Sequence, residues 1–123
     1  MFEKKLYIAK RLKVESNENG IDVEYFEKPK LYNFNYQPVS GYLGLQQYGE
    51  EIGNVYRMFV DKALYQGKIK VGDRAYLSNG EITESELEQL IQNEKDFGDN
   101  ANYKIELVLP QNFKMQIDLI KIK

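Results

Sequence analysis

Cysteine, histidine and tryptophan are absent from this sequence of 123 residues. A chain without cysteine forms no disulfide and offers no thiolate ligand to zinc. A chain without histidine lacks the side chain that most often moves protons near neutral pH. These absences predict a protein that is not an enzyme and that carries neither a metal ion nor another cofactor.

No run of apolar residues approaches the length of a membrane-spanning helix, and no apolar segment of the kind found in secretion signals follows Met1. We therefore expect no association with a membrane. The formal net charge of −2 disfavours a protein whose main task is to grip nucleic-acid phosphates. The length and an apolar content of 42% are typical of one globular domain, which we place over residues 1–123.

Apolar and polar residues alternate along most of the sequence, which is the pattern of half-buried β-strands. Leu6, Ile8, Leu12 and Val14 share one parity and predict a first strand. The turn at residues 17–20 ends in Asn-Gly, which favours a tight hairpin. The other expected strands cover residues 21–25, 32–37, 55–60, 69–71, 75–77, 103–109 and 113–119, with 55–60 buried on both faces.

One helix is expected. The Thr83 hydroxyl is placed to cap the amide of Glu86, and an apolar stripe begins at Leu87. We place this helix over about residues 84–95. With about seven strands and no β-α-β rhythm, the sequence predicts a mostly β fold, a small antiparallel β-barrel or sandwich.

Tyrosine is abundant, with ten residues, and aromatic side chains alternate with amides over residues 32–37. Packing in the core is the favoured interpretation, because aromatic rings bury a large apolar area. The alternative is an OB-like module that stacks single-stranded nucleic acid on an aromatic face beside basic residues. That module would use Tyr32, Phe34 and Tyr36 with Lys10, Arg11 and Lys13.

A glycine-rich stretch over residues 41–53 predicts a long loop, and loops of this length in compact domains are often functional. Tyr42 and Tyr48 lie in it and suit a protein–protein surface, where tyrosine is enriched.

Paired carboxylates leave a hydrolase as a further alternative. The pairs are Glu50 with Glu51 and Asp96 with Asp99. Adjacent acids on a strand point to opposite faces, so the first pair is a poor catalytic dyad.

Charge is unevenly distributed along the chain. Residues 1–14 contain five basic residues and one acidic residue, whereas residues 81–99 contain seven acidic residues and one lysine. The simpler interpretation is that the basic and acidic segments form two solvated faces. The more specific one is that they contact each other between neighbouring copies of the chain. The residues of that contact are Lys4, Lys5, Lys10, Arg11 and Lys13 on one side and Glu84, Glu86 and Glu88 on the other.

Short motifs follow one another in the second part of the chain: Tyr48-Gly49-Glu50-Glu51, Val55-Tyr56-Arg57, Val71-Gly72-Asp73-Arg74-Ala75-Tyr76-Leu77, Asn102-Tyr103-Lys104-Ile105 and Ile117-Asp118-Leu119-Ile120. In this order they resemble the head–tail connector proteins of tailed bacteriophages, also called head-closure, stopper or head–tail joining proteins. The resemblance covers roughly residues 45–123 and leaves the N-terminal hairpin unassigned.

The resemblance implies a small β-barrel that assembles with copies of itself into a ring beneath the portal. Such a ring contacts portal or adaptor proteins and tail proteins, and helps to retain packaged DNA. Double-stranded DNA would pass through the ring only as cargo. The protein would reside in the virion, and in the host cytoplasm before assembly. The loop over residues 41–53 would be the docking or gating element. Its residues inserted into a partner would be Tyr42, Leu43, Leu45 and Tyr48.

Overall fold

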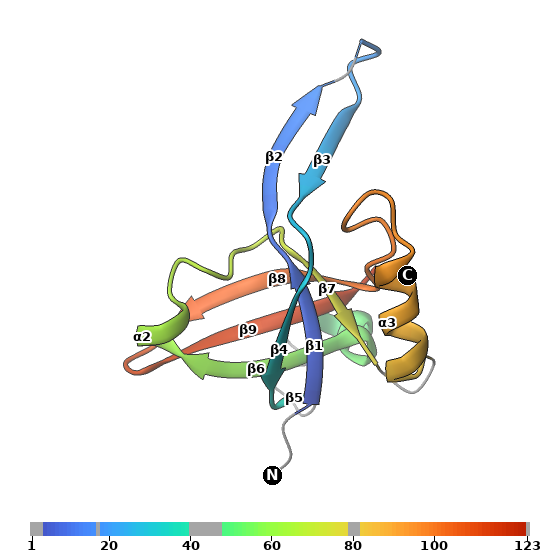
Figure 1. Cartoon of the computed structure of the whole chain (residues 1–123). Coiled ribbons are helices and arrows are strands. Elements are labelled where there is room, and N and C mark those ends of the chain that lie inside the picture. The colour runs from blue at the N-terminus through green and yellow to red at the C-terminus, as the bar shows by residue number, and fades with distance from the viewer. Residues whose placement is uncertain (1–3, 17, 40–47, 79–81, 123) are drawn as a thin grey trace.

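The computed structural model describes residues 4–16, 18–39, 48–78 and 82–122 (Figure 1). Their fold is mostly β, as the alternation of apolar residues predicts. The strands are β1 (Lys4–Ala9), β2 (Arg11–Ser16), β3 (Asp22–Phe26), β4 (Lys30–Phe34), β5 (Tyr36–Pro38), β6 (Val55–Asp61), β7 (Arg74–Leu77), β8 (Tyr103–Pro110) and β9 (Lys114–Lys121). The helices are the 3-10 helix η1 (Gly49–Asn54) and the α-helices α2 (Lys62–Tyr65) and α3 (Glu84–Gln92).

Seven strands form one antiparallel sheet in the order β4-β1-β7-β8-β9-β6-β5, and β2 and β3 form a separate two-stranded sheet. Only Asn35 separates β4 from β5, although these strands lie at the two ends of the large sheet. The chain therefore brings the two edges of this sheet together, and the sheet curls around its core. It is not closed into a barrel, so the architecture is sandwich-like.

The core follows from the alternation along β1 and β7. Leu6 and Ile8 of β1 face the inside of the curled sheet, whereas Ala9 faces the other side. The inner cluster combines these residues with apolar side chains of six other strands. The outer cluster packs α3 against β1 and β7 through Ala9, Tyr76, Leu87, Ile91 and Ala101.

The predicted N-terminal strand is two strands that belong to different sheets. Leu6 and Ile8 are buried, but Leu12 and Val14 are 57% and 46% exposed. The prediction that one face of this segment is buried was wrong for Leu12 and Val14, because β2 leaves the body of the molecule (Figure 1). The predicted hairpin itself is confirmed as β2 and β3.

Three other strand predictions need correction. The predicted strand 32–37 is interrupted at Asn35, and its two parts pair with different strands. β6 is not buried on both faces, since Phe59 is 49% exposed. Residues 69–71 form no strand, because the Asp73 carboxylate accepts a hydrogen bond from the Lys70 amide and closes a turn there.

The predicted helix is confirmed as α3, and the Thr83 hydroxyl accepts a hydrogen bond from the Glu86 amide at 3.2 Å. The helix ends at Gln92, earlier than predicted. The last two strands are also confirmed, although β9 begins at Lys114 and leaves Phe113 outside the strand and exposed.

Candidate functional site

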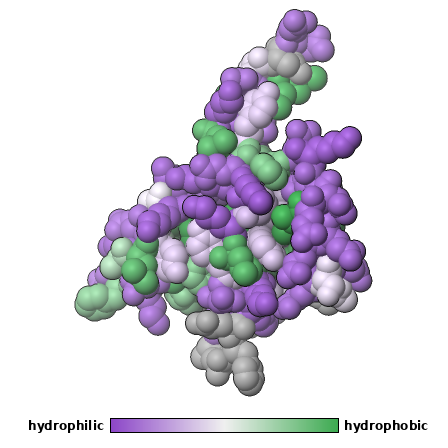
Figure 2. All heavy atoms as spheres, in the orientation of Figure 1, coloured by the Kyte–Doolittle hydropathy of each residue, from purple (hydrophilic) through white to green (hydrophobic). Residues whose placement is uncertain are grey.

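The hairpin of β2 and β3, here called the arm, projects from the body of the molecule (Figure 1). Its strands pair only with each other in the described part of the chain, and every residue of β2 is exposed. In Figure 2, hydrophobic side chains lie on the arm between hydrophilic ones. The exposed apolar side chains of the arm are Leu12, Val14, Ile21, Val23 and Tyr25.

The register of the arm places charged and apolar side chains on both of its faces. Lys13 lies opposite Tyr25, with its ammonium 5.0 Å from the ring centroid, and forms an ion pair with Glu15 on the same face. Val14 and Glu24 lie opposite each other on the second face. An irregularity between Arg11 and Lys13 shifts the register where the arm leaves the body.

The base of the arm is attached to the body by Asp73, which is 2% exposed. Its carboxylate accepts hydrogen bonds from the Arg11 amide at 2.9 Å and from the Lys70 amide at 3.0 Å. The Glu27 amide donates to the Lys10 carbonyl at 2.8 Å and joins the two chain segments that enter the arm. The motif Gly-Asp-Arg at residues 72–74 thus holds the arm where it starts.

Charged and aromatic groups hold the same base from the side. The Glu24 carboxylate on β3 forms ion pairs with Arg74, at 2.7 Å, and with Arg11, at 3.6 Å. The Arg74 guanidinium also lies 5.1 Å from the centroid of the Phe26 ring. Gly98 has φ +91°, and a Cβ there would lie 2.5 Å from the Phe26 ring. The Phe26 ring therefore packs directly on the backbone of the loop that follows α3.

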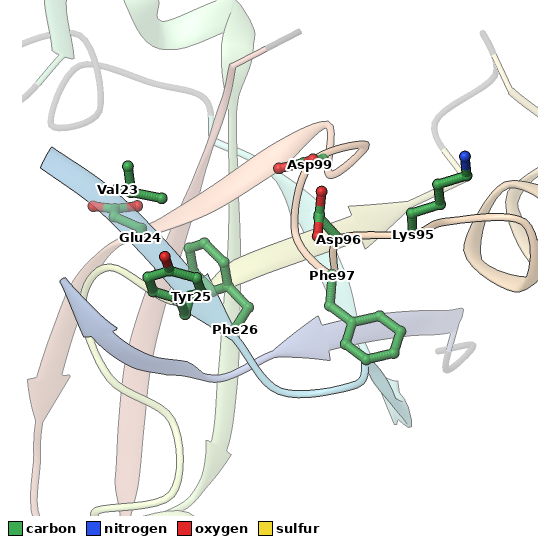
Figure 3. Close-up of a pocket in the computed structure, with 8 residues that line it drawn as sticks. All are labelled: Val23, Glu24, Tyr25, Phe26, Lys95, Asp96, Phe97 and Asp99. Carbon is green, nitrogen blue, oxygen red and sulfur yellow. The ribbon is translucent and has the colours of Figure 1, made fainter. Parts of the chain in front are cut away.

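That loop and β3 form the two walls of a pocket of about 470 Å³ (Figure 3). The buried hydroxyl of Tyr76 organises the loop, because it donates to Glu94 and accepts from the Gly98 amide at 2.8 Å. Burial, together with the Glu94 carboxylate, raises the pKa of Tyr76. The pocket is lined by Val23, Glu24, Tyr25 and Phe26 from β3 and by Lys95, Asp96, Phe97 and Asp99 from the loop.

A second polar cluster lies on the large sheet. Asp118 on β9 is fully buried and binds Arg57 on β6 through two hydrogen bonds, at 2.7 and 3.0 Å. The Tyr48 hydroxyl donates to the same carboxylate at 2.5 Å. Burial and this hydrogen bond raise the pKa of Tyr48. Three of the motifs that carry the resemblance therefore meet in one cluster.

The predicted docking residues Tyr42, Leu43 and Leu45 lie outside the described residues. Tyr48 is half-buried, and the partner of its hydroxyl is Asp118 of the same chain. The side chains of Glu50 and Glu51 likewise lie outside what the structure describes.

The basic residues proposed for a subunit contact are spread over three places. Lys4 and Lys5 lie on β1, Lys10 lies at the junction with the arm, and Arg11 and Lys13 lie on the arm. The acidic residues Glu84, Glu86 and Glu88 are exposed on α3. The Tyr7 hydroxyl lies 3.5 Å from the Glu88 carboxylate, so the acidic helix and β1 are neighbours within one chain. The subunit contact stays a prediction.

The aromatic face predicted over residues 32–37 is mostly internal. Phe34 and Tyr36 are 8% and 2% exposed, so their packing in the core is confirmed. Tyr32 is half-buried and opens onto a second pocket, which it shares with Lys10. Of the three rings of the stacking alternative, Tyr32 alone is partly open to solvent.

The described residues contain no cluster of three acidic side chains that could hold a metal ion. None of the helices seen in these residues is both long and apolar enough to cross a bilayer.

Sequence reasoning missed the projection of the arm and the charged pocket beside Tyr32. For the projection of the arm, the one available signal was Lys10. It interrupts the alternation of apolar residues just where β1 ends. The charged pocket has no local signal, because its lining residues come from three separate segments of the chain. The chain matches no protein-family model, no curated protein and no solved structure.

Proposed function

We propose that this chain is a structural assembly subunit that joins copies of itself into a ring through its arm. The proposed ring is the head–tail connector of a tailed bacteriophage, which docks beneath the portal and helps to retain packaged DNA. The observation that carries this proposal is the projecting arm with its exposed apolar side chains. Single exposed apolar residues are ordinary on a monomer, but a group of them on one projecting ribbon favours an interaction surface.

The attachment of the arm supports the same role. Asp73, Arg74 and Glu24 hold its base by hydrogen bonds and ion pairs. A binding element that is held in one orientation before it meets its partner loses less conformational entropy on binding. Asp73 and Arg74 also belong to the motifs that resemble the connector family, so the resemblance and the arm depend on the same residues.

Sedimentation of a lysate that produces the encoding phage or prophage tests the proposal. The chain should band with filled heads or whole particles. If particles form while the chain stays with free soluble protein, the connector assignment fails.

A matched pair of variants tests the arm. Leu12→Thr, Val14→Thr and Val23→Thr together remove apolar surface from the arm and place there β-branched threonine, which suits strands. The control changes Leu31→Thr, Leu64→Thr and Leu109→Thr, which are exposed elsewhere. We expect the arm variant to be lost from the fraction that contains phage particles, and the control variant to remain in that fraction. Equal loss in both variants would contradict the role of the arm.

A further inference from the structure

A second pocket, of about 430 Å³, lies where the arm joins the body. It is built from β1, the turn between β3 and β4, β4 itself, and the segment that follows β6. Its lining residues are Ile8, Lys10, Glu27, Lys28, Lys30, Tyr32, Tyr65 and Lys68. The size falls within the usual range of about 300–1,000 Å³ for small-molecule sites.

The floor of this pocket is apolar and aromatic. Tyr32 and Tyr65 meet edge to face with their ring centroids 6.1 Å apart. Both rings also pack on Phe34, at 5.3 and 5.1 Å between centroids. Ile8 is 4% exposed and belongs to the inner core. The floor is thus held in place by the core beneath it.

The rim of the pocket is basic. Four lysines come from three separate segments of the chain, and Glu27 is the one acidic residue of the lining. None of the salt bridges found within the described ranges uses these lysines, whereas Arg11 and Lys13 are paired with Glu24 and Glu15. A concentration of positive charge around a hollow makes the electrostatic potential there more positive, which favours an anion.

We propose that this pocket binds a nucleotide unit, with the ring of the base on the aromatic floor and the phosphate among the rim lysines. The floor suits a flat ring, since bases stack on aromatic side chains without regard to their sequence. The rim supplies ammonium groups for phosphate oxygens. The Tyr32 hydroxyl is protonated at neutral pH and supplies a hydrogen-bond donor, and burial raises its pKa further above the ordinary value. The nucleotide belongs to a free molecule or to a nucleic-acid strand, and neither source depends on the connector assignment.

The test uses the purified chain at low salt with three probes: a fluorescently labelled oligothymidylate, ATP and inorganic triphosphate. Fluorescence anisotropy measures binding of the oligonucleotide, and calorimetry measures binding of the other two. We expect saturable binding of oligothymidylate, of ATP or of both, and weaker binding of inorganic triphosphate. Binding of ATP identifies a free nucleotide as a ligand, and binding of the oligonucleotide alone identifies a strand.

The variant Lys30→Gln with Lys68→Gln removes two exposed rim charges. We expect binding about tenfold weaker and, for a strand, a salt dependence reduced by about 1.4 in the slope of log K against log salt concentration. The control, Lys104→Gln with Lys114→Gln, removes the same charge from positions outside the pocket and should bind as the parent does.

The proposal is overturned if no probe binds saturably at low salt. Equal weakening in the control also overturns it, because any surface lysine would then serve. Binding of inorganic triphosphate as tight as that of ATP and of the oligonucleotide overturns the role of the aromatic floor, and with it the nucleotide assignment.

Discussion

Arg57 on β6 lies directly across the ladder from Asp118 on β9 and holds its carboxylate through two hydrogen bonds. Hydrogen bonding to Asp118 raises the pKa of Arg57. Tyr48 completes the cluster, because its hydroxyl donates a hydrogen bond to the same carboxylate. The cluster thus connects one residue of the predicted docking loop, Tyr48, to strands β6 and β9 of the sheet.

Replacing Arg57 with methionine should destabilise the fold by about 3 kcal/mol or more, because it leaves a buried carboxylate without its charged partner. Chemical denaturation measures the change. The control is Lys104→Met, which breaks the exposed ion pair with Glu106 and should cost about 1 kcal/mol or less. Similar losses in the two variants would show that Asp118 does not depend on Arg57.

Replacing Gly98 with alanine should destabilise the fold and displace the base of the arm. Gly67→Ala is the control, because Gly67 has a similar φ of +82° but open space around it. Both changes strain the backbone, and only Gly98→Ala forces a Cβ onto the Phe26 ring. We expect the difference in unfolding free energy between the two to be about 1–3 kcal/mol, the usual cost of overpacking. No difference would mean that Phe26 moves aside freely.

Replacing Asp73 with alanine should release the arm, since the amides of Arg11 and Lys70 lose their acceptor. We expect a loss of about 2 kcal/mol or more in stability and faster hydrogen exchange in β2 and β3. Asp61→Ala also removes a carboxylate that accepts from two amides, but at the exposed start of α2. That control should cost about 1 kcal/mol and leave exchange in the arm unchanged; faster exchange there in both variants would contradict the role of Asp73.

Stability should fall as the pH rises from about 10 to about 12. Burial raises the pKa of Tyr36 to about 12 from its ordinary value of 10.0. Over this interval the unfolded chain releases the Tyr36 proton and the folded chain retains it, so unfolding is favoured by increasing pH. Below pH 10 the contribution is fully present. The measurement is the unfolding free energy at several pH values.

Tyr36→Phe isolates this residue from the other groups that titrate at high pH. The variant loses the hydrogen bond to the Ser78 carbonyl but cannot ionise at this position. The parent should therefore lose more stability than the variant between pH 10 and 12. Parallel curves for the two proteins would contradict the raised pKa.

Local patterns were sufficient for most of the secondary structure. The Asn-Gly turn predicted the arm hairpin, alternation predicted β8 and β9, and the Thr83 cap predicted α3. The alternation over residues 69–71 was misleading, because a turn forms there instead of a strand. Ile69 is buried in the core without a strand, because the carboxylate of Asp73 closes the turn beside it.

The candidate sites were less predictable than the fold. The sequence pointed to the loop over residues 41–53 and to aromatic residues, of which Tyr32 does line a pocket. It could not bring Lys10 beside Lys68, or Arg57 opposite Asp118, since strand order and register set those contacts.

The sequence by itself determined a cysteine-free, mostly β domain, because side-chain periodicity and turn chemistry act over a few residues. The tertiary structure decided which apolar residues are buried. Ile8 and Val14 have the same parity, yet Ile8 lies in the core and Val14 lies on the arm. The difference arises because β1 has neighbours on both sides in the large sheet, whereas the arm pairs only with itself among the described strands, and burial depends on what a strand packs against rather than on its pattern.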